Sequence, residues 1–91
     1  MSIDVRIPAP LRKVTNGADR VTVEAETLAL VIEALNDAHP GIKDRLCNES
    51  GELRNFVNVY INGEDVRFLN GLESVTKSGD EISIVPAVAG G

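Results

Sequence analysis

The chain carries few side chains that could do conventional catalysis. It has one histidine, His39, and one cysteine, Cys47. His39 stands in a His-Pro-Gly sequence typical of a helix end, where the macrodipole favours a cation. A Cys–His pair would need a third group to orient it, and none is evident, so we expect Cys47 to be a half-buried loop residue. The adjacent acids Glu64 and Asp65 follow an Asn-Gly pair and are predicted to be exposed hairpin residues.

The end of the chain is the exception. Pro86 cannot donate to a β-ladder, and it is followed by five small, uncharged residues: Ala87, Val88, Ala89, Gly90 and Gly91. Five extended residues reach roughly 17 Å, far enough to place a terminal carboxylate inside the active site of another protein. Glycine at both final positions lets the backbone pass a narrow channel and leaves the last carbonyl unshielded.

This tail also has a simpler interpretation. Two terminal glycines arise by chance in roughly one chain in 200, and chain ends are commonly glycine-rich. A tail that only faces solvent is usually polar, however, and this one is apolar and small. We therefore predict that the reactive group is the Gly91 carboxylate, on a flexible Gly-Gly tail (87–91) that follows a folded domain (1–86).

Composition narrows the function classes. A length of 91 residues allows one domain. The net charge of −5 argues against nucleic acid and against anionic membranes, both of which need a basic face. A single cysteine excludes an internal disulfide and a cysteine-based metal cluster. The alternating N-terminus does not resemble a signal peptide, and no stretch has the length of a membrane span. These features predict a cytoplasmic protein.

The first half of the sequence predicts two strands and a helix. Residues 3–7 alternate apolar and polar side chains, as residues 21–25 do after a turn at Asn16-Gly17. Thr27 is a suitable N-cap. A helix with one apolar stripe follows, formed by Leu28, Val31, Ile32, Leu35 and Ala38, and Pro40-Gly41 ends it.

The second half predicts three strands. Ile42 and Leu46 are expected to pack on the core from a short helical turn. A strand over 56–61 should bury Val57, Val59 and Ile61, and Asn62-Gly63 is a strong hairpin signal. Val66 and Phe68 are expected to continue the returning strand. A short helical turn over 71–75, a turn over 77–80 and a last strand over 81–85, with Ile82 and Ile84 inward, complete the chain.

The predicted order is β-β-α-β-β-β, an α+β fold in which a mixed sheet wraps over one main helix. We expect the first and last strands to lie side by side at the centre, as in the ubiquitin-like β-grasp. A ferredoxin-like sandwich would need a second full helix, and nothing after Gly41 has the periodicity for one.

Two segments carry a resemblance to a known family. The run Phe56-Val57-Asn58-Val59-Tyr60-Ile61-Asn62-Gly63-Glu64-Asp65-Val66-Arg67 resembles the central hairpin of bacterial ubiquitin-like sulfur carriers. The ending Gly79-Asp80-Glu81-Ile82-Ser83-Ile84-Val85-Pro86-Ala87-Val88-Ala89-Gly90-Gly91 is similar to the close of the same MoaD/ThiS-type group. The hairpin and the length lean toward its cysteine-biosynthesis branch.

The resemblance implies a reaction cycle in which the chain is a carrier and not an enzyme. An ATP-dependent activating enzyme would adenylate the Gly91 carboxylate, and sulfur would replace the adenylate to give a thiocarboxylate. In the cysteine branch, a pyridoxal-phosphate synthase would join that sulfur to an aminoacrylate, and a zinc-dependent peptidase would release cysteine. The cofactors would belong to these partners, and none is expected on this chain. A pterin or thiazole precursor is the alternative acceptor.

A carrier without catalytic side chains must supply recognition with its body. The candidates are Phe56, Asn58 and Tyr60, of which Asn58 and Tyr60 should point to the sheet face away from the helix; Ala87, Val88, Ala89 and Gly90 should also contact the partner. Tyr60 could equally be an ordinary surface aromatic. Two other functions remain open: a protein modifier joined to lysines through Gly91, and a binding module whose tail is incidental.

Overall fold

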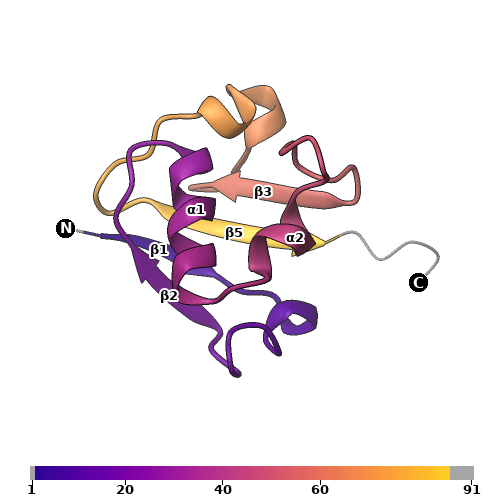
Figure 1. Ribbon diagram of the computed structural model, residues 1–91. Helices are drawn as coiled ribbons and strands as arrows, with labels where there is room; N and C mark the ends of the chain where they lie inside the picture. Colours follow the sequence, from indigo (N-terminus) through magenta and orange to yellow (C-terminus); the bar gives the residue numbers. More distant parts are fainter. Residues whose placement is uncertain (1, 87–91) are drawn as a thin grey trace.

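The sheet of this protein has its first and last strands at the centre (Figure 1). The structure is a computed structural model that describes residues 2–86. Within them the strands are β1 (Ile3–Arg6), β2 (Arg20–Val23), β3 (Val57–Ile61), β4 (Glu64–Asp65) and β5 (Glu81–Pro86). Their order is β2-β1-β5-β3-β4. β1 and β5 run parallel and the other pairs antiparallel, so the predicted β-grasp arrangement is confirmed.

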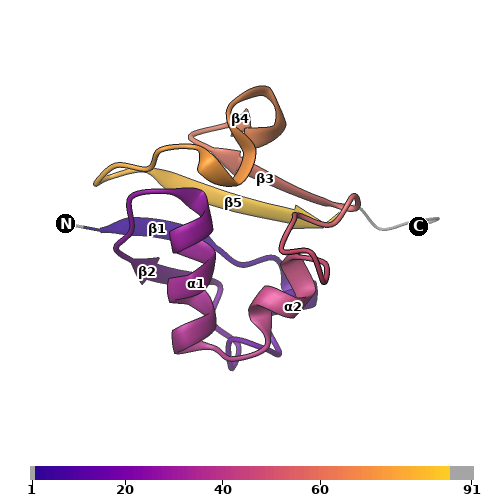
Figure 2. The same ribbon diagram turned by 45° about the horizontal axis from the view of Figure 1, so that its top comes forward.

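Two α-helices cover one face of this sheet, α1 (Leu28–Ala38) and α2 (Ile42–Leu46) (Figure 2). Short 3₁₀ turns fill the connections at Ala9–Leu11, Val66–Phe68 and Gly71–Glu73. The core between the layers is aliphatic: alternate residues of β1, β3 and β5 are buried and face the buried stripe of α1. Burial of such side chains is the main stabilising term of a small domain.

Local sequence explains where α1 begins and ends. The Thr27 hydroxyl accepts a hydrogen bond from the Leu30 amide (3.3 Å), which satisfies one of the free N–H groups of the first turn. After the helix, Gly41 has φ 104°, a conformation that favours glycine. The stripe is one residue shorter than predicted, because Ala38 is exposed in the last turn and only Leu28, Val31, Ile32 and Leu35 are buried.

The β3–β4 hairpin forms at the predicted Asn-Gly pair. Asn62 and Gly63 have φ values of 51° and 88°, as a type I′ turn requires. The prediction that Val66 and Phe68 continue the returning strand is wrong. The Asp65 carboxylate accepts a hydrogen bond from the Arg67 amide (2.9 Å), which starts a 3₁₀ turn in place of further pairing. Phe68 is 87% exposed there.

β5 continues one residue further than predicted, through Pro86, which lies opposite Val57. At the other end of the pair, the Asn62 amide donates to the Glu81 carbonyl (2.8 Å). Since hydrogen-bonded and non-bonded pairs alternate in an antiparallel ladder, Val57 and Pro86 form a non-bonded pair. A proline costs no β3–β5 hydrogen bond in that position.

Candidate functional site

The end of β5 is the part of the fold that leads to the predicted reactive group. β5 pairs with β1 over Glu81–Ser83 and with β3 over Ile82–Pro86, so the strand has neighbours on both edges in its first half and on the β3 edge where it ends. The five predicted tail residues, Ala87, Val88, Ala89, Gly90 and Gly91, lie outside the described residues. The structure therefore defines the folded domain up to Pro86, the residue that precedes the tail.

Asn58 and Tyr60 lie on the outer face of the sheet, as predicted. Both are half-buried while their neighbours Val57, Val59 and Ile61 are buried on the helix side. The register places Asn58 opposite Val85 and Tyr60 opposite Ser83, and Val85 is 45% exposed. Alternation along a strand puts all four side chains on one face, which combines an aromatic ring, an amide, a hydroxyl and an apolar group close to the end of β5.

Phe56 takes a different position. It precedes β3, is 50% exposed, and lines an open pocket of about 380 Å³ on the helix side of the sheet. The other lining residues are Pro10, Leu11, Arg45, Arg54, Val57 and Pro86. The three predicted recognition residues are thus divided between two surfaces, both next to the end of β5. The apolar pocket suits small side chains, and its exposed Arg45 can bind an anion.

Arg67 is a functional candidate that the sequence did not reveal. Its guanidinium donates to the Asn58 side chain and to the carbonyl oxygens of Val57 (2.9 Å), Arg54 (3.2 Å) and Asn55 (3.4 Å). β4 pairs only with Tyr60 and Ile61, so the β3 edge at Val57 lacks a neighbouring strand. Arg67 covers that edge and fixes Asn58 on the outer face. Its role depends on a 3₁₀ turn that replaces the strand expected there.

The conventional catalytic side chains lie away from this end or are inert. Cys47 is 4% exposed and therefore more buried than predicted. It follows α2, where its amide donates to the Lys43 carbonyl (2.8 Å) and an isolated bridge pairs it with Leu53. Burial raises the pKa of the Cys47 thiol, with a smaller opposing effect from Lys43. The thiol is therefore protonated near neutral pH and is a weak nucleophile.

The remaining acids and the histidine have structural positions. His39 is the C-cap of α1. Glu64 is exposed in the hairpin and Asp65 caps the following turn, so both are hairpin residues as predicted. Among residues 2–86, no three His, Cys, Asp or Glu side chains come together as a metal site would require. Within the same range, no helix is long and apolar enough to cross a membrane.

Comparison with known proteins gives full-length matches. Residues 5–91 match the ThiS family. The chain is 45% identical to the sulfur carrier protein CysO of Mycobacterium tuberculosis over all of both chains. It is 35% identical to small archaeal modifier protein 3 of Haloferax volcanii, again over all of both chains. It also superposes on a chain in the crystal structure of the Amycolatopsis orientalis BexX/CysO complex, with a TM-score of 0.93 and 46% identity over 98% of this chain and 99% of that one.

Proposed function

Since the chain belongs to the ThiS family of ubiquitin-like sulfur carriers, we propose that it carries sulfur as a thiocarboxylate on Gly91 for the biosynthesis of cysteine. The observation that supports the cysteine branch is the full-length 45% identity to CysO. The resemblance of the hairpin over 56–67 to that of the cysteine branch supports it as well.

The adenylation proposed for Gly91 depends on its α-carboxylate. An α-carboxylate has a pKa of roughly 3.5 and is ionised at neutral pH, so one oxygen can attack the α-phosphate of ATP on an activating enzyme. Pyrophosphate leaves, and an acyl adenylate remains. A sulfide donor then displaces AMP at the carbonyl carbon, which leaves a thiocarboxylate and releases a proton. The sulfur stays tethered to the chain and is not lost as free sulfide.

The thiocarboxylate sulfur would next attack an electrophilic, serine-derived acceptor on a pyridoxal-phosphate enzyme and form a thioester. Transfer of the acyl group from sulfur to the neighbouring amine gives an amide, and a zinc-dependent peptidase would hydrolyse it to cysteine and the original carboxylate. In this scheme ATP, pyridoxal phosphate and zinc act on the partner enzymes. This chain contributes the carboxylate and the surfaces that present it. We place the cycle in the cytoplasm, where ATP is supplied.

Those surfaces support the proposal by their position. The face carrying Asn58 and Tyr60 and the pocket lined by Phe56 both adjoin the end of β5. Because β5 is paired with β3 as far as Pro86, an enzyme that binds either surface receives residues 87–91 from a defined starting point. Such preorganisation reduces the entropy lost when the chain end enters an active site.

Intact-mass spectrometry tests the carrier step. The protein is incubated with an ATP-dependent activating enzyme, ATP and sulfide, and it should gain the mass difference between sulfur and oxygen. A variant that lacks Gly91 is the matched control and should not gain it. An unchanged mass for the full chain, under conditions where a known carrier is converted, would refute the proposal. Addition of a pyridoxal-phosphate cysteine synthase and an activated serine should then add one cysteinyl group. Failure at that step alone would move the carrier to the pterin or thiazole branch.

The identity to small archaeal modifier protein 3 favours protein modification as a second candidate function. The same acyl adenylate can be attacked by a lysine amine of another protein, which gives an isopeptide bond. This function predicts conjugates of higher mass that leave residues 78–91, ending in Gly90-Gly91, on target lysines after trypsin digestion, because Lys77 is the last basic residue of the sequence. Their absence from cells that accumulate the thiocarboxylate would restrict the chain to sulfur transfer.

A further inference from the structure

All six arginines of this acidic chain lie around the end of the sheet where β5 finishes. Arg6 closes β1 beside β5, and Arg20 lies opposite Arg6 at the start of β2. Arg45 and Arg54 line the pocket that contains Pro86. The other two are Arg67, which bonds to Val57, and Arg12, which bonds to Ile7 just beyond β1. A chain of net charge −5 therefore has its arginines collected next to the residues that lead to Gly91.

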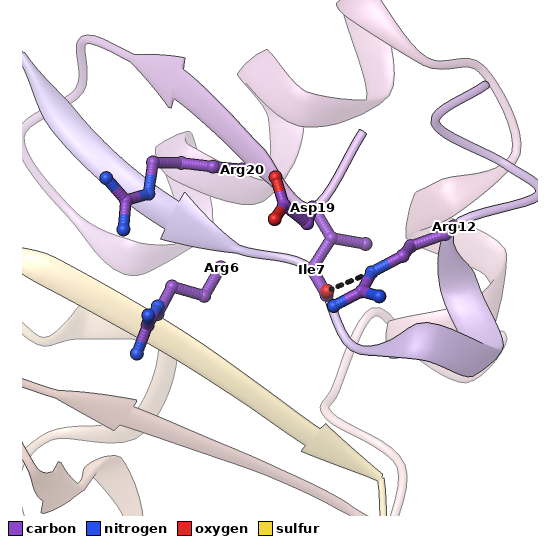
Figure 3. Close-up of a pocket in the computed structure, with 5 residues that line it drawn as sticks. All are labelled: Arg6, Ile7, Arg12, Asp19 and Arg20. Atoms are coloured by element: carbon purple, nitrogen blue, oxygen red, sulfur yellow. Dashed lines mark hydrogen bonds between the residues drawn. The ribbon is translucent and has the colours of Figure 1, made fainter. Parts of the chain in front are cut away.

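Some of these arginines serve the fold. Arg67 donates hydrogen bonds to carbonyl groups at the β3 edge. Arg54 donates two hydrogen bonds to the Asp44 carbonyl (3.2 and 3.0 Å). Arg45 is exposed beside the pocket that contains Pro86. The other three, Arg6, Arg12 and Arg20, lie together and remain available to an outside ligand; they are here called the arginine face. Together with Ile7 and Asp19 they line an open pocket of about 380 Å³ (Figure 3).

The arginine face keeps most of its donors free. Arg12 donates its Nε to the Ile7 carbonyl (3.1 Å), and no protein acceptor for its two Nη groups is found within residues 2–86. The Arg20 guanidinium has no hydrogen-bond or ion-pair partner in the part of the chain that the structure describes. Arg6 has one distant ion pair, with Glu81 at 3.9 Å. All three arginines are exposed, so their donors can reach a partner without rearrangement of the fold.

The β1–β2 register makes the arginine face unfavourable for the isolated domain. Arg6 and Arg20 are directly opposite in neighbouring strands, and Figure 3 shows both side chains extending from that pair of strands. Like charges in such a cross-strand pair are destabilising. An external anion between the two guanidinium groups would relieve this repulsion. An acidic residue at position 6 or position 20 would have avoided the repulsion without a ligand.

We propose that the arginine face binds an acidic segment of the enzyme that activates Gly91. Guanidinium groups pair with carboxylates through two parallel hydrogen bonds, so several spaced acidic side chains can each bind one arginine. A compact phosphate fits less well, because it would concentrate its charge beside the Asp19 carboxylate that lines the same pocket, whereas spaced carboxylates can bind the arginines at separate points. The rest of this acidic chain repels an acidic surface too, so a partner would be turned toward the end that carries Gly91. The identity of the partner rests on the proposed function.

Binding can be tested without that function. Amide chemical shifts of the full chain are followed by NMR during titration with a poly-glutamate peptide and, separately, with inorganic pyrophosphate. The peptide should shift the amides around Arg6, Arg12 and Arg20 in a saturable, salt-sensitive manner. Arg20→Glu, which removes no internal hydrogen bond of the described residues, should abolish the shifts, and Lys77→Glu should not. Shifts with pyrophosphate but not with the peptide, or equal shifts in both variants, would overturn the proposal.

Activation kinetics give the second test. In Arg12→Glu/Arg20→Glu, kcat/KM for pyrophosphate release by the adenylating enzyme should fall about tenfold or more, the size expected for loss of electrostatic steering. Lys77→Glu carries a charge reversal at an exposed lysine and should keep kcat/KM within about twofold of the parent. Equal rates for all three proteins would refute the docking surface and leave the carrier function intact. No activation of the parent protein would instead refute the carrier function.

Discussion

Replacing Arg67 with alanine should loosen the edge of β3 that β4 does not cover. The guanidinium makes one part-buried hydrogen bond, to the Val57 carbonyl (2.9 Å), and its bonds to the Arg54 and Asn55 carbonyls are exposed. A hydrogen bond to a charged group contributes about 1.5–3 kcal/mol, and water replaces exposed ones at little cost. Counting only the Val57 bond in full, we expect Arg67→Ala to lower the free energy of unfolding by about 2 kcal/mol.

Urea unfolding followed by circular dichroism measures this change, and a thermal melt should show a Tm lower by about 8–16 °C for a domain of this size. Arg67→Lys should lose most of the same stability, because an ammonium group keeps the charge but cannot bond several carbonyls in a fork. Arg20→Ala is the matched control. It removes an exposed arginine with no side-chain partner among residues 2–86 and should change stability by less than about 0.5 kcal/mol. Equal stability of Arg67→Ala and Arg20→Ala would refute the edge-covering role of Arg67.

Three further changes test other parts of the fold. Gly63→Ala places a Cβ at φ 88° and should cost about 1–2 kcal/mol in urea unfolding; a neutral result would mean that the turn adopts another conformation. Leu46→Ala empties a site that is 0% exposed and should cost about 2–5 kcal/mol, so a stability loss below that range would show that α2 is not part of the core. Burial raises the pKa of the Cys47 thiol above its ordinary 9.0, so the folded state keeps a proton that the unfolded chain loses first. This contribution to stability is present below pH 9 and is lost as pH rises further; Cys47→Ala should flatten that decline, and an identical slope in both proteins would contradict it.

The sequence predicted the elements whose signals are local. Thr27 and Gly41 bound α1 because capping and positive φ depend on a few neighbouring residues. Asn62-Gly63 fixed the hairpin for the same reason. The central position of the first and last strands was also predicted, from the order of elements and not from any single residue.

Features that depend on the folded arrangement were missed. Phe68 reads as a strand residue, but the cap by Asp65 turns the backbone before it can pair. Cys47 is more buried than its polar surroundings in sequence suggested, because it closes α2 against the core. The gathering of the arginines could not be foreseen either. They are scattered from Arg6 to Arg67, and only the sheet register and the 3₁₀ turns bring them to one end.

The position of β5 has a consequence for synthesis of the protein on the ribosome. The second edge of β1 stays unpaired until β5 has been synthesised. The two strands are separated by most of the chain, as the pairing of Asp4 with Glu81 shows. Contacts of such high sequence separation form late and slow folding. A nascent chain that stops before residue 81 has an open gap in the middle of its sheet and exposes both edges to proteolysis and aggregation. Completion of the native sheet therefore requires translation through β5, so chains that stop before this strand do not persist as folded copies of the domain.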